Sequence, residues 1–118
     1  TVTHSMFNAT RDGLGAGEFN TERMLAHLPA QPSYSAAYSC AQYQGGGFGD
    51  WYLPSLYELN LLYSAKNTVG TFTRAYPAQY WSSTEYDANN AYYIEFTYGS
   101  QIGGGKGYVR YVRAVRRF

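Results

Sequence analysis

The stretch that decides the fold is Gly49-Asp50-Trp51-Tyr52-Leu53-Pro54-Ser55-Leu56-Tyr57-Glu58-Leu59. Ser55 and Glu58 have the spacing of a capping box, in which the serine hydroxyl and the glutamate carboxylate each accept a backbone N–H at the start of a helix. Leu59, Leu62 and Tyr63 follow at helical spacing. The segment therefore predicts an amphipathic helix that begins after Ser55 and packs its apolar stripe against a core.

Two shorter helices are predicted before this one. Asn20 can cap a helix over residues 21–28, and the glycine-rich residues 1–19 before it are expected to be irregular. Small apolar residues recur at helical spacing in residues 34–43, and the glycines at 45–47 end that pattern. The first half of the chain thus reads as helical.

The second half has the aromatic and β-branched texture of strands. We expect strands at residues 80–86, 91–98 and 109–118, with 101–107 as a flexible glycine-rich connection that projects from the sheet. Helices that precede strands, without alternation, favour an α+β fold in which short helices pack on a small, mostly antiparallel sheet.

Composition limits the function classes. The 118 residues fit a single domain, or the C-terminal part of a longer chain, and hydrophobic residues make up 45%. Charged residues make up only 14% with a net charge of +1, which disfavours a disordered chain and a nucleic-acid binder. No apolar run is long enough for membrane insertion. The unusual feature is tyrosine, with 14 residues, a residue type that recognition surfaces favour.

Motifs for catalysis and for metal or cofactor binding are missing from the sequence. The glycine clusters do not have phosphate-loop spacing, and the single cysteine, Cys40, is expected to be a small buried hydrophobe. The hydroxyls of residues 82–84 lack a neighbouring base, and Glu85 and Asp87 lack calcium-loop spacing. We therefore expect no enzymatic activity, no cofactor and no metal.

Four sequence motifs occur in an order that resembles a known family: residues 49–59, 80–85, 91–96 and 112–116. They resemble the C-terminal domain of bacterial collagen-like adhesins, and equally the related C-type-lectin-like variable proteins of diversity-generating retroelements. The resemblance implies a C-type-lectin-like fold with a non-enzymatic, ligand-binding role. It also implies an extracellular location, on a bacterial cell surface, a pilus tip or a phage tail fibre, and a monomer or homotrimer. The partner would be a macromolecular ligand, either a protein or a surface glycan.

The retroelement resemblance implies which residues bind the ligand. Such systems change adenines, typically in asparagine codons, and the residues that these changes reach form a set within 87–110 that we expect to bind: Asp87, Asn89, Asn90, Tyr93, Thr97, Tyr98, Ser100, Ile102, Gly103, Gly104, Gly105, Gly107, Tyr108 and Arg110. Residues outside the reachable set would be fixed scaffold positions: Glu85, Glu95, Gln101 and Lys106. An ordinary tyrosine-rich strand and loop is the alternative interpretation.

The tyrosines divide into two groups on this hypothesis. Tyr93, Tyr98 and Tyr108 are expected to be solvent-exposed on one side of the domain as rigid anchors. The others are expected to pack within helix and strand patterns: Tyr38, Tyr43, Tyr57, Tyr63 and Tyr80.

A basic C-terminal stretch supports a second hypothesis, a trimeric adhesin that binds sulfated glycans. The residues that would bind the polyanion are Lys106, Arg110, Arg113 and Arg117, with Arg116 in the same stretch. The structural alternative is that the arginines of this stretch pair inside the fold with acids such as Glu58, Glu85 or Glu95.

Overall fold

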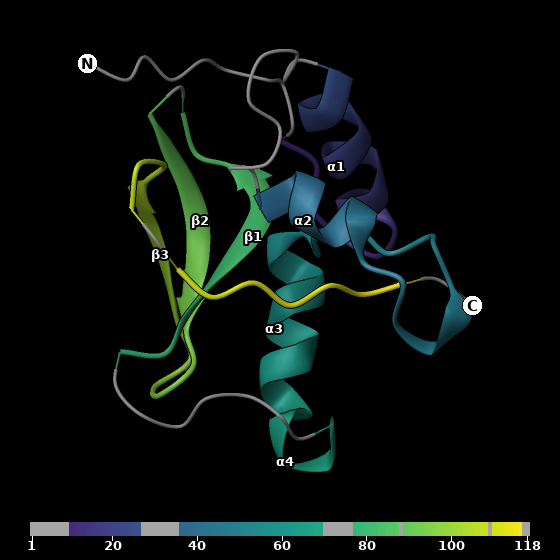
Figure 1. The fold of residues 1–118 in the computed structure, drawn as a ribbon. Helices are drawn as coiled ribbons and strands as arrows, with labels where there is room; N and C mark the ends of the chain where they lie inside the picture. Colours follow the sequence, from purple (N-terminus) through teal and green to yellow (C-terminus); the bar gives the residue numbers. More distant parts are fainter. Residues whose placement is uncertain (1–9, 27–35, 70–76, 88, 109, 117–118) are drawn as a thin grey trace.

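The computed structural model describes residues 10–26, 36–69, 77–87, 89–108 and 110–116. Its elements are helices α1 (Ala16–Ala26), α2 (Ala36–Gln42), α3 (Leu56–Ser64) and α4 (Lys66–Val69), a short 3-10 turn at Gly45–Gly47, and strands β1 (Gln79–Glu85), β2 (Asn90–Glu95) and β3 (Ser100–Gly105). The strands form one antiparallel sheet in the order β1-β2-β3 (Figure 1). The predicted α+β class is confirmed. No helix within the described ranges is long and apolar enough to span a membrane.

Both faces of the sheet are covered. On one face, Leu59 of α3 packs on Tyr80, Ile94 and Phe96. On the other face, Cys40 of α2 packs with the strand residues Trp81 and Tyr93 and with Leu53 from the connection before α3. Because neighbouring strand residues point to opposite faces, this sheet has no solvated face at its centre.

The capping box at Ser55 and Glu58 is confirmed, and it also fixes α1. Glu58 accepts the Ser55 N–H at 3.0 Å, and its two oxygens further accept the N–H groups of Gly15 at 3.1 Å and Gly17 at 2.9 Å. The Tyr52 hydroxyl donates to the same carboxylate at 3.0 Å. One buried carboxylate therefore satisfies backbone donors at the beginnings of two helices.

The predicted start of α1 at residue 21 is wrong, because the helix begins at Ala16. Asn20 does not cap it. Asn20 lies in the middle of the helix, and its side chain is buried. This side chain accepts from the Arg11 N–H at 3.2 Å and donates to the Arg11 carbonyl at 2.7 Å. The helix can begin beside the tightly packed Gly17, where an added Cβ would lie 2.5 Å from Glu58 Oε1.

Buried polar groups join β1 to β2 and to the segments before β1. The Ser82 hydroxyl donates to the Tyr92 carbonyl at 2.7 Å, and Thr84 Oγ1 accepts the Leu56 N–H at 3.0 Å. The Ser83 N–H donates to the Pro54 carbonyl at 2.7 Å. The Ser83 hydroxyl accepts from the Asn20 side chain at 3.4 Å, so all three hydroxyls of residues 82–84 lie in a strand and have structural partners, as predicted.

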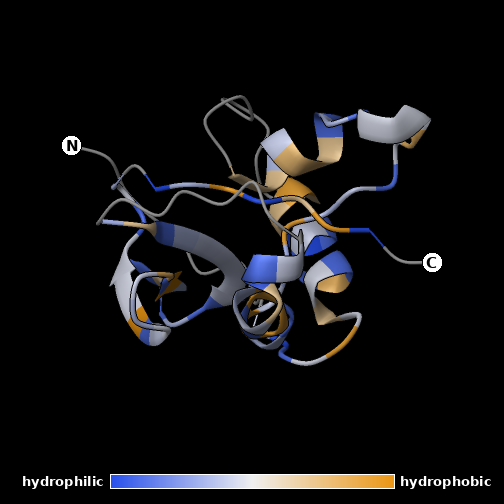
Figure 2. Ribbon diagram, turned by 90° about the horizontal axis from the view of Figure 1, so that it is seen from below, coloured by the Kyte–Doolittle hydropathy of each residue, from blue (hydrophilic) through white to orange (hydrophobic). Residues whose placement is uncertain are grey.

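The predicted third strand over residues 109–118 is also wrong in its described part, and residues 109, 117 and 118 lie outside the described residues. Within the described residues 110–116, only isolated bridges form, from Tyr111 to Tyr80 and from Val115 to Tyr52. This C-terminal segment runs beside β1 and continues past the helices (Figure 1), and its hydrophilic and hydrophobic residues alternate in blue and orange (Figure 2). It therefore covers the edge of β1 that β2 does not.

The third strand is instead β3, at residues expected to form a flexible connection. Its glycines provide room for aromatic rings. An added Cβ would lie 2.9 Å from Tyr86 at Gly103, 2.5 Å from Tyr93 at Gly104 and 2.9 Å from Tyr108 at Gly105. Glycine here permits close packing rather than flexibility, which composition alone does not reveal.

Candidate functional site

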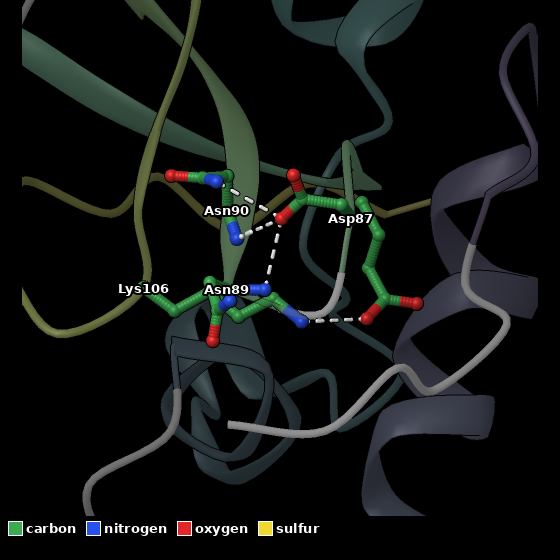
Figure 3. A network of polar contacts seen from close by, with 5 residues as sticks. Asp87, Asn89, Asn90 and Lys106 are labelled. Atoms are coloured by element: carbon green, nitrogen blue, oxygen red, sulfur yellow. Dashed lines mark hydrogen bonds and ion pairs between the residues drawn. The ribbon is translucent and has the colours of Figure 1, made fainter. Parts of the chain in front are cut away.

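Two connections meet at one end of the sheet and form the tip loops, defined as residues 86, 87 and 89 after β1 and residues 106–108 after β3. One oxygen of Asp87 accepts from the N–H groups of Asn89 at 2.9 Å and Asn90 at 2.8 Å, and from the Asn90 side chain at 2.9 Å. Figure 3 shows this carboxylate pointing between the two asparagines. The bond from the Asn90 side chain and those from the backbone lower the pKa of Asp87. The first tip loop is thus held by its own side chain.

A buried ion pair joins the second tip loop to the sheet. Lys106 Nζ lies 2.7 Å from Glu85 Oε2, and the Glu85 side chain is fully buried. The Lys106 N–H also donates to the Asn89 carbonyl at 2.9 Å, so the ladder between β2 and β3 continues into the loops. Both tip loops therefore have a fixed backbone.

Exposed tyrosine rings lie at both ends of β3. Tyr98, in the turn before β3, is 70% exposed, and Tyr108, after β3, is 71% exposed, which confirms their expected exposure. Tyr86 is 58% exposed and belongs to the same surface, although it was not among the predicted binding residues. The sequence predicts Tyr86 as the last residue of a strand. Its place at a strand end is the one sequence signal that could have indicated an exposed ring.

The expected exposure of Tyr93 is wrong. Its side chain is only 7% exposed, and its ring makes an edge contact with Trp81 at 6.1 Å between centroids. The Arg110 guanidinium lies 4.1 Å from the Tyr93 ring centroid on the same sheet face. Tyr93 is buried because α2 and the C-terminal segment cover a strand face that the prediction left open to solvent.

Arg110 is likewise part of the packing. Its guanidinium lies 4.3 Å from the Trp81 ring, and it donates to Gln79 Oε1 at 3.1 Å and to the Gly105 carbonyl at 2.8 Å. Stacked between aromatic rings and bound by two acceptors, this side chain supports the sheet.

The other predicted binding residues occupy three places. Asn89 and Gly107 are exposed in the tip loops, and Asn90 is half-buried at the start of β2. Thr97 is half-buried in the turn beside Tyr98. The β3 residues change from exposed to half-buried along the strand: Ser100, Ile102 and Gly103 are exposed, and Gly104 and Gly105 are half-buried. The structure therefore arranges most of the predicted set along β3 and its two ends, but not Tyr93.

The expected scaffold positions differ among themselves. Glu85 and Glu95 are buried, and Lys106 is largely covered by its pair with Glu85, so all three have a packing reason to stay fixed. Gln101 is exposed on β3. Packing gives no reason for Gln101 to be invariant.

Comparison with known families matches residues 8–116 to the model described as the Lcl C-terminal domain. The chain belongs to the Lcl C-terminal domain family. No curated protein matches the chain. Membership relates the chain to the C-terminal domains of Lcl-type collagen-like adhesins, as the resemblance implied, and indicates an adhesin-related domain with a surface-exposed location.

In this Lcl C-terminal domain, a separate cleft of about 560 Å³ lies between α2 and the C-terminal segment. It is lined by Ser39, Cys40, Tyr43, Trp51, Val112, Arg113 and Ala114. Burial raises the pKa of the Cys40 thiol to about 12, so this side chain is a neutral core residue at physiological pH, as expected. The lining contains no carboxylate.

Two tyrosines expected to pack are instead about half exposed in this Lcl C-terminal domain. They are Tyr43, beside Trp51 at the cleft, and Tyr57, on the outer side of α3. No group of three or more metal-binding side chains comes together among the residues that the structure describes.

Proposed function

We propose that this Lcl C-terminal domain is a non-enzymatic recognition domain that binds a macromolecular ligand along β3, through the tip loops at one end and the Tyr98 turn at the other. The observation that carries the proposal is the contrast between exposed rings and a fixed backbone. Tyr86, Tyr98 and Tyr108 present their rings to solvent, while the network of Glu85, Lys106 and Asp87 holds the loops.

Recognition favours this combination for an energetic reason. A tyrosine side chain offers a large contact area with few rotatable bonds, so little conformational entropy is lost when it binds. A loop that is already ordered by hydrogen bonds adds little further entropy cost. The neutral Cys40 thiol and the structural hydroxyls of residues 82–84 also support a role without catalysis.

We further propose that the exposed part of this surface tolerates diversification in the manner of retroelement variable proteins. The packing limits the positions at which this is feasible. Exposed residues can change without loss of core contacts: Asn89, Tyr98, Ser100, Ile102, Gly107 and Tyr108. Asp87 is exposed too, but it is expected to stay constant because its carboxylate holds the first tip loop. Tyr93, Gly104 and Arg110 pack against one another and are expected to stay constant. Gene sequences from many isolates test this, and differences spread evenly along the chain would contradict it.

Binding of sulfated glycans as a trimer is less well supported. Of the cations required, Lys106 pairs with Glu85 and Arg110 is stacked on Trp81 and Tyr93. Arg113 lines the cleft between α2 and the C-terminal segment, and Arg117 lies outside the described residues. A heparin column tests this alternative, since polyanion binding would give retention that falls steeply with added salt.

The experiment for the main proposal compares matched sets of exposed tyrosines. Wild type and the variant Tyr86→Ser/Tyr98→Ser/Tyr108→Ser are screened on a glycan array and on a panel of purified surface and matrix proteins. A ligand that contacts these rings is expected to bind the triple variant at least about 30-fold more weakly, since truncating an aromatic hot spot costs about 2 kcal/mol or more.

The control is Tyr43→Ser/Tyr57→Ser, which removes two exposed rings far along the chain from the proposed surface. It is expected to bind like wild type. Equal weakening in both variants, or in neither, would overturn the assignment of the surface to β3 and its ends.

A further inference from the structure

The outer edge of β3 is a terminal edge of the sheet. Strand β2 pairs with one side of β3, from Asn90 with Gly105 to Glu95 with Ser100. The sheet order places no strand on the other side within the described residues, and Figure 1 shows β3 on the side of the sheet away from the helices. The two sheet edges therefore differ, because the C-terminal segment covers β1 at Tyr111.

The register shows which backbone groups face outward. Lys106 N–H donates to the Asn89 carbonyl, and hydrogen-bonded residues alternate along an antiparallel pair. The residues of β3 that bond β2 are therefore Ser100, Ile102 and Gly104, whereas Gln101, Gly103 and Gly105 direct their N–H and C=O groups away from the sheet. Gly105 fits this assignment, because its carbonyl accepts from Arg110 Nη1 at 2.8 Å and from the Tyr108 N–H at 3.3 Å.

The usual protections of an exposed edge are missing from β3. Its sequence Ser-Gln-Ile-Gly-Gly-Gly contains no proline and no charged residue. Edge strands of monomeric proteins usually carry such residues, because unpaired backbone groups otherwise bind another strand. Residues 100–103 of β3 are exposed.

We propose that the outer edge of β3 binds an extended polypeptide segment of another protein, which adds to the sheet as a further strand through Gln101 and Gly103. This proposal rests on the proposed function and names the partner class, since β3 is the middle of that surface. Donor and acceptor groups that recur every second residue match the backbone of a β-strand. The rings of Tyr98 and Tyr108 flank the edge and would contact side chains at the two ends of the segment.

The first measurement is amide hydrogen exchange on the free protein. The outward N–H groups of Gln101 and Gly103 are expected to exchange at least about tenfold faster than the inward ones of Ile102 and Gly104. Protection of Gln101 and Gly103 equal to that of Ile102 and Gly104 would overturn the proposal, since the edge would then already be occupied.

The second measurement uses a defined probe, a peptide of about eight residues with alternating threonine and valine, titrated onto the full chain and followed by amide chemical shifts. Binding is expected to shift and protect Gln101 and Gly103. Gln101→Pro removes one outward N–H and leaves the pairing with β2 intact, so affinity is expected to fall about threefold to tenfold. Gln101→Ala keeps the N–H and is the matched control.

The outcomes separate this proposal from the proposed function. If Gln101→Pro and Gln101→Ala bind the peptide equally, edge pairing is overturned, while the tyrosine surface is still tested by its own triple variant. If the wild-type chain self-associates through this edge and Gln101→Pro abolishes that association, the occupant is a second copy and the proposed partner is wrong. A peptide N-methylated at every residue has no N–H donor on either edge and is expected to lose binding, and its retention would overturn pairing through the backbone.

Discussion

At the scale of single residues, Gly104 shows why a glycine-rich segment can be rigid. Its missing side chain leaves room for the Tyr93 ring and the Arg110 guanidinium, which an added Cβ would approach to 2.5 and 2.7 Å. Neither neighbour can move easily, because each packs against Trp81. The glycine-rich sequence predicts a flexible linker here. The prediction fails because the side chains that require glycine at position 104 come from β2 and from the C-terminal segment.

Gly104→Ala is therefore expected to destabilise the fold by about 1–3 kcal/mol through overpacking. Urea denaturation measures this. Gly49→Ala is the control, because an added Cβ there meets nothing within 4 Å, and it is expected to change stability by less than about 0.5 kcal/mol. Similar stability for both variants would show that the space around Gly104 is not restrictive.

Glu95 gives the domain a dependence on pH. Burial raises the pKa of this carboxyl, but N–H groups of Thr97 at 2.9 Å and Ala78 at 3.1 Å bind the charged form and outweigh burial. The pKa in the folded state is thus below its ordinary value of 4.5. A group with a lowered pKa stabilises the fold above its unfolded pKa, and this contribution is lost as the pH falls through the folded value.

We expect the stability difference between wild type and Glu95→Gln to shrink as the pH is lowered from about 7 to about 3. Urea denaturation at several pH values measures it. Glu22→Gln, at an exposed position of α1, is the control and should show no such convergence. A difference that stays constant with pH would contradict the role assigned to the Glu95 carboxylate.

At the scale of elements, the sequence predicts the helix boundaries that depend on neighbouring residues, but not those that depend on residues distant in the chain. The start of α3 follows from Ser55 and Glu58, which are neighbours in the chain and bind each other. The start of α1 depends on the same Glu58, which lies 41 residues from Gly17 in sequence. The exposed ends of β3 were likewise foreseen at Tyr98 and Tyr108, but the burial of Tyr93 required knowing that the C-terminal segment crosses its face.

Glu58 should accordingly matter more than an ordinary capping residue. Glu58→Ala leaves the N–H groups of Gly15, Gly17 and Ser55 without this acceptor, and we expect a loss of about 3 kcal/mol or more. Tyr52→Phe removes only the hydroxyl that donates to the same carboxylate, and about 1 kcal/mol is expected. Thermal denaturation ranks the two variants, and a reversed order would disprove the shared role in capping.

At the scale of the whole molecule, the basic C-terminal segment packs against the sheet and the core from outside. Arg110 stacks on rings of β1 and β2, whereas Arg116 pairs with the half-exposed Asp50 at 2.8 Å. Lys106 pairs with Glu85, one of the acids that the structural alternative named as partners for the arginines. Arg116 has a partner that the sequence did not indicate.

Arg110→Ala is expected to lower stability by about 2–3 kcal/mol, because it removes stacking and two hydrogen bonds together. Arg110→Lys should recover only part of this, since an ammonium lacks the planar fork. The control Arg116→Ala breaks a surface ion pair and should cost less than about 1 kcal/mol. Chemical denaturation compares the three variants, and full recovery by lysine would show that charge alone matters.

The C-terminal segment closes the fold through contacts with distant parts of the chain. Tyr52 and Val115 exchange hydrogen bonds at 2.7 and 2.9 Å, and Tyr111 completes the edge of β1. A core closed by contacts between distant parts of the chain folds slowly, because loop entropy is lost before the contacts form. We therefore expect the outer edge of β1 to stay unpaired during synthesis until Tyr111 has left the ribosome. An unpaired strand edge can associate with other chains, so we expect the nascent chain to be more prone to aggregation than the folded domain.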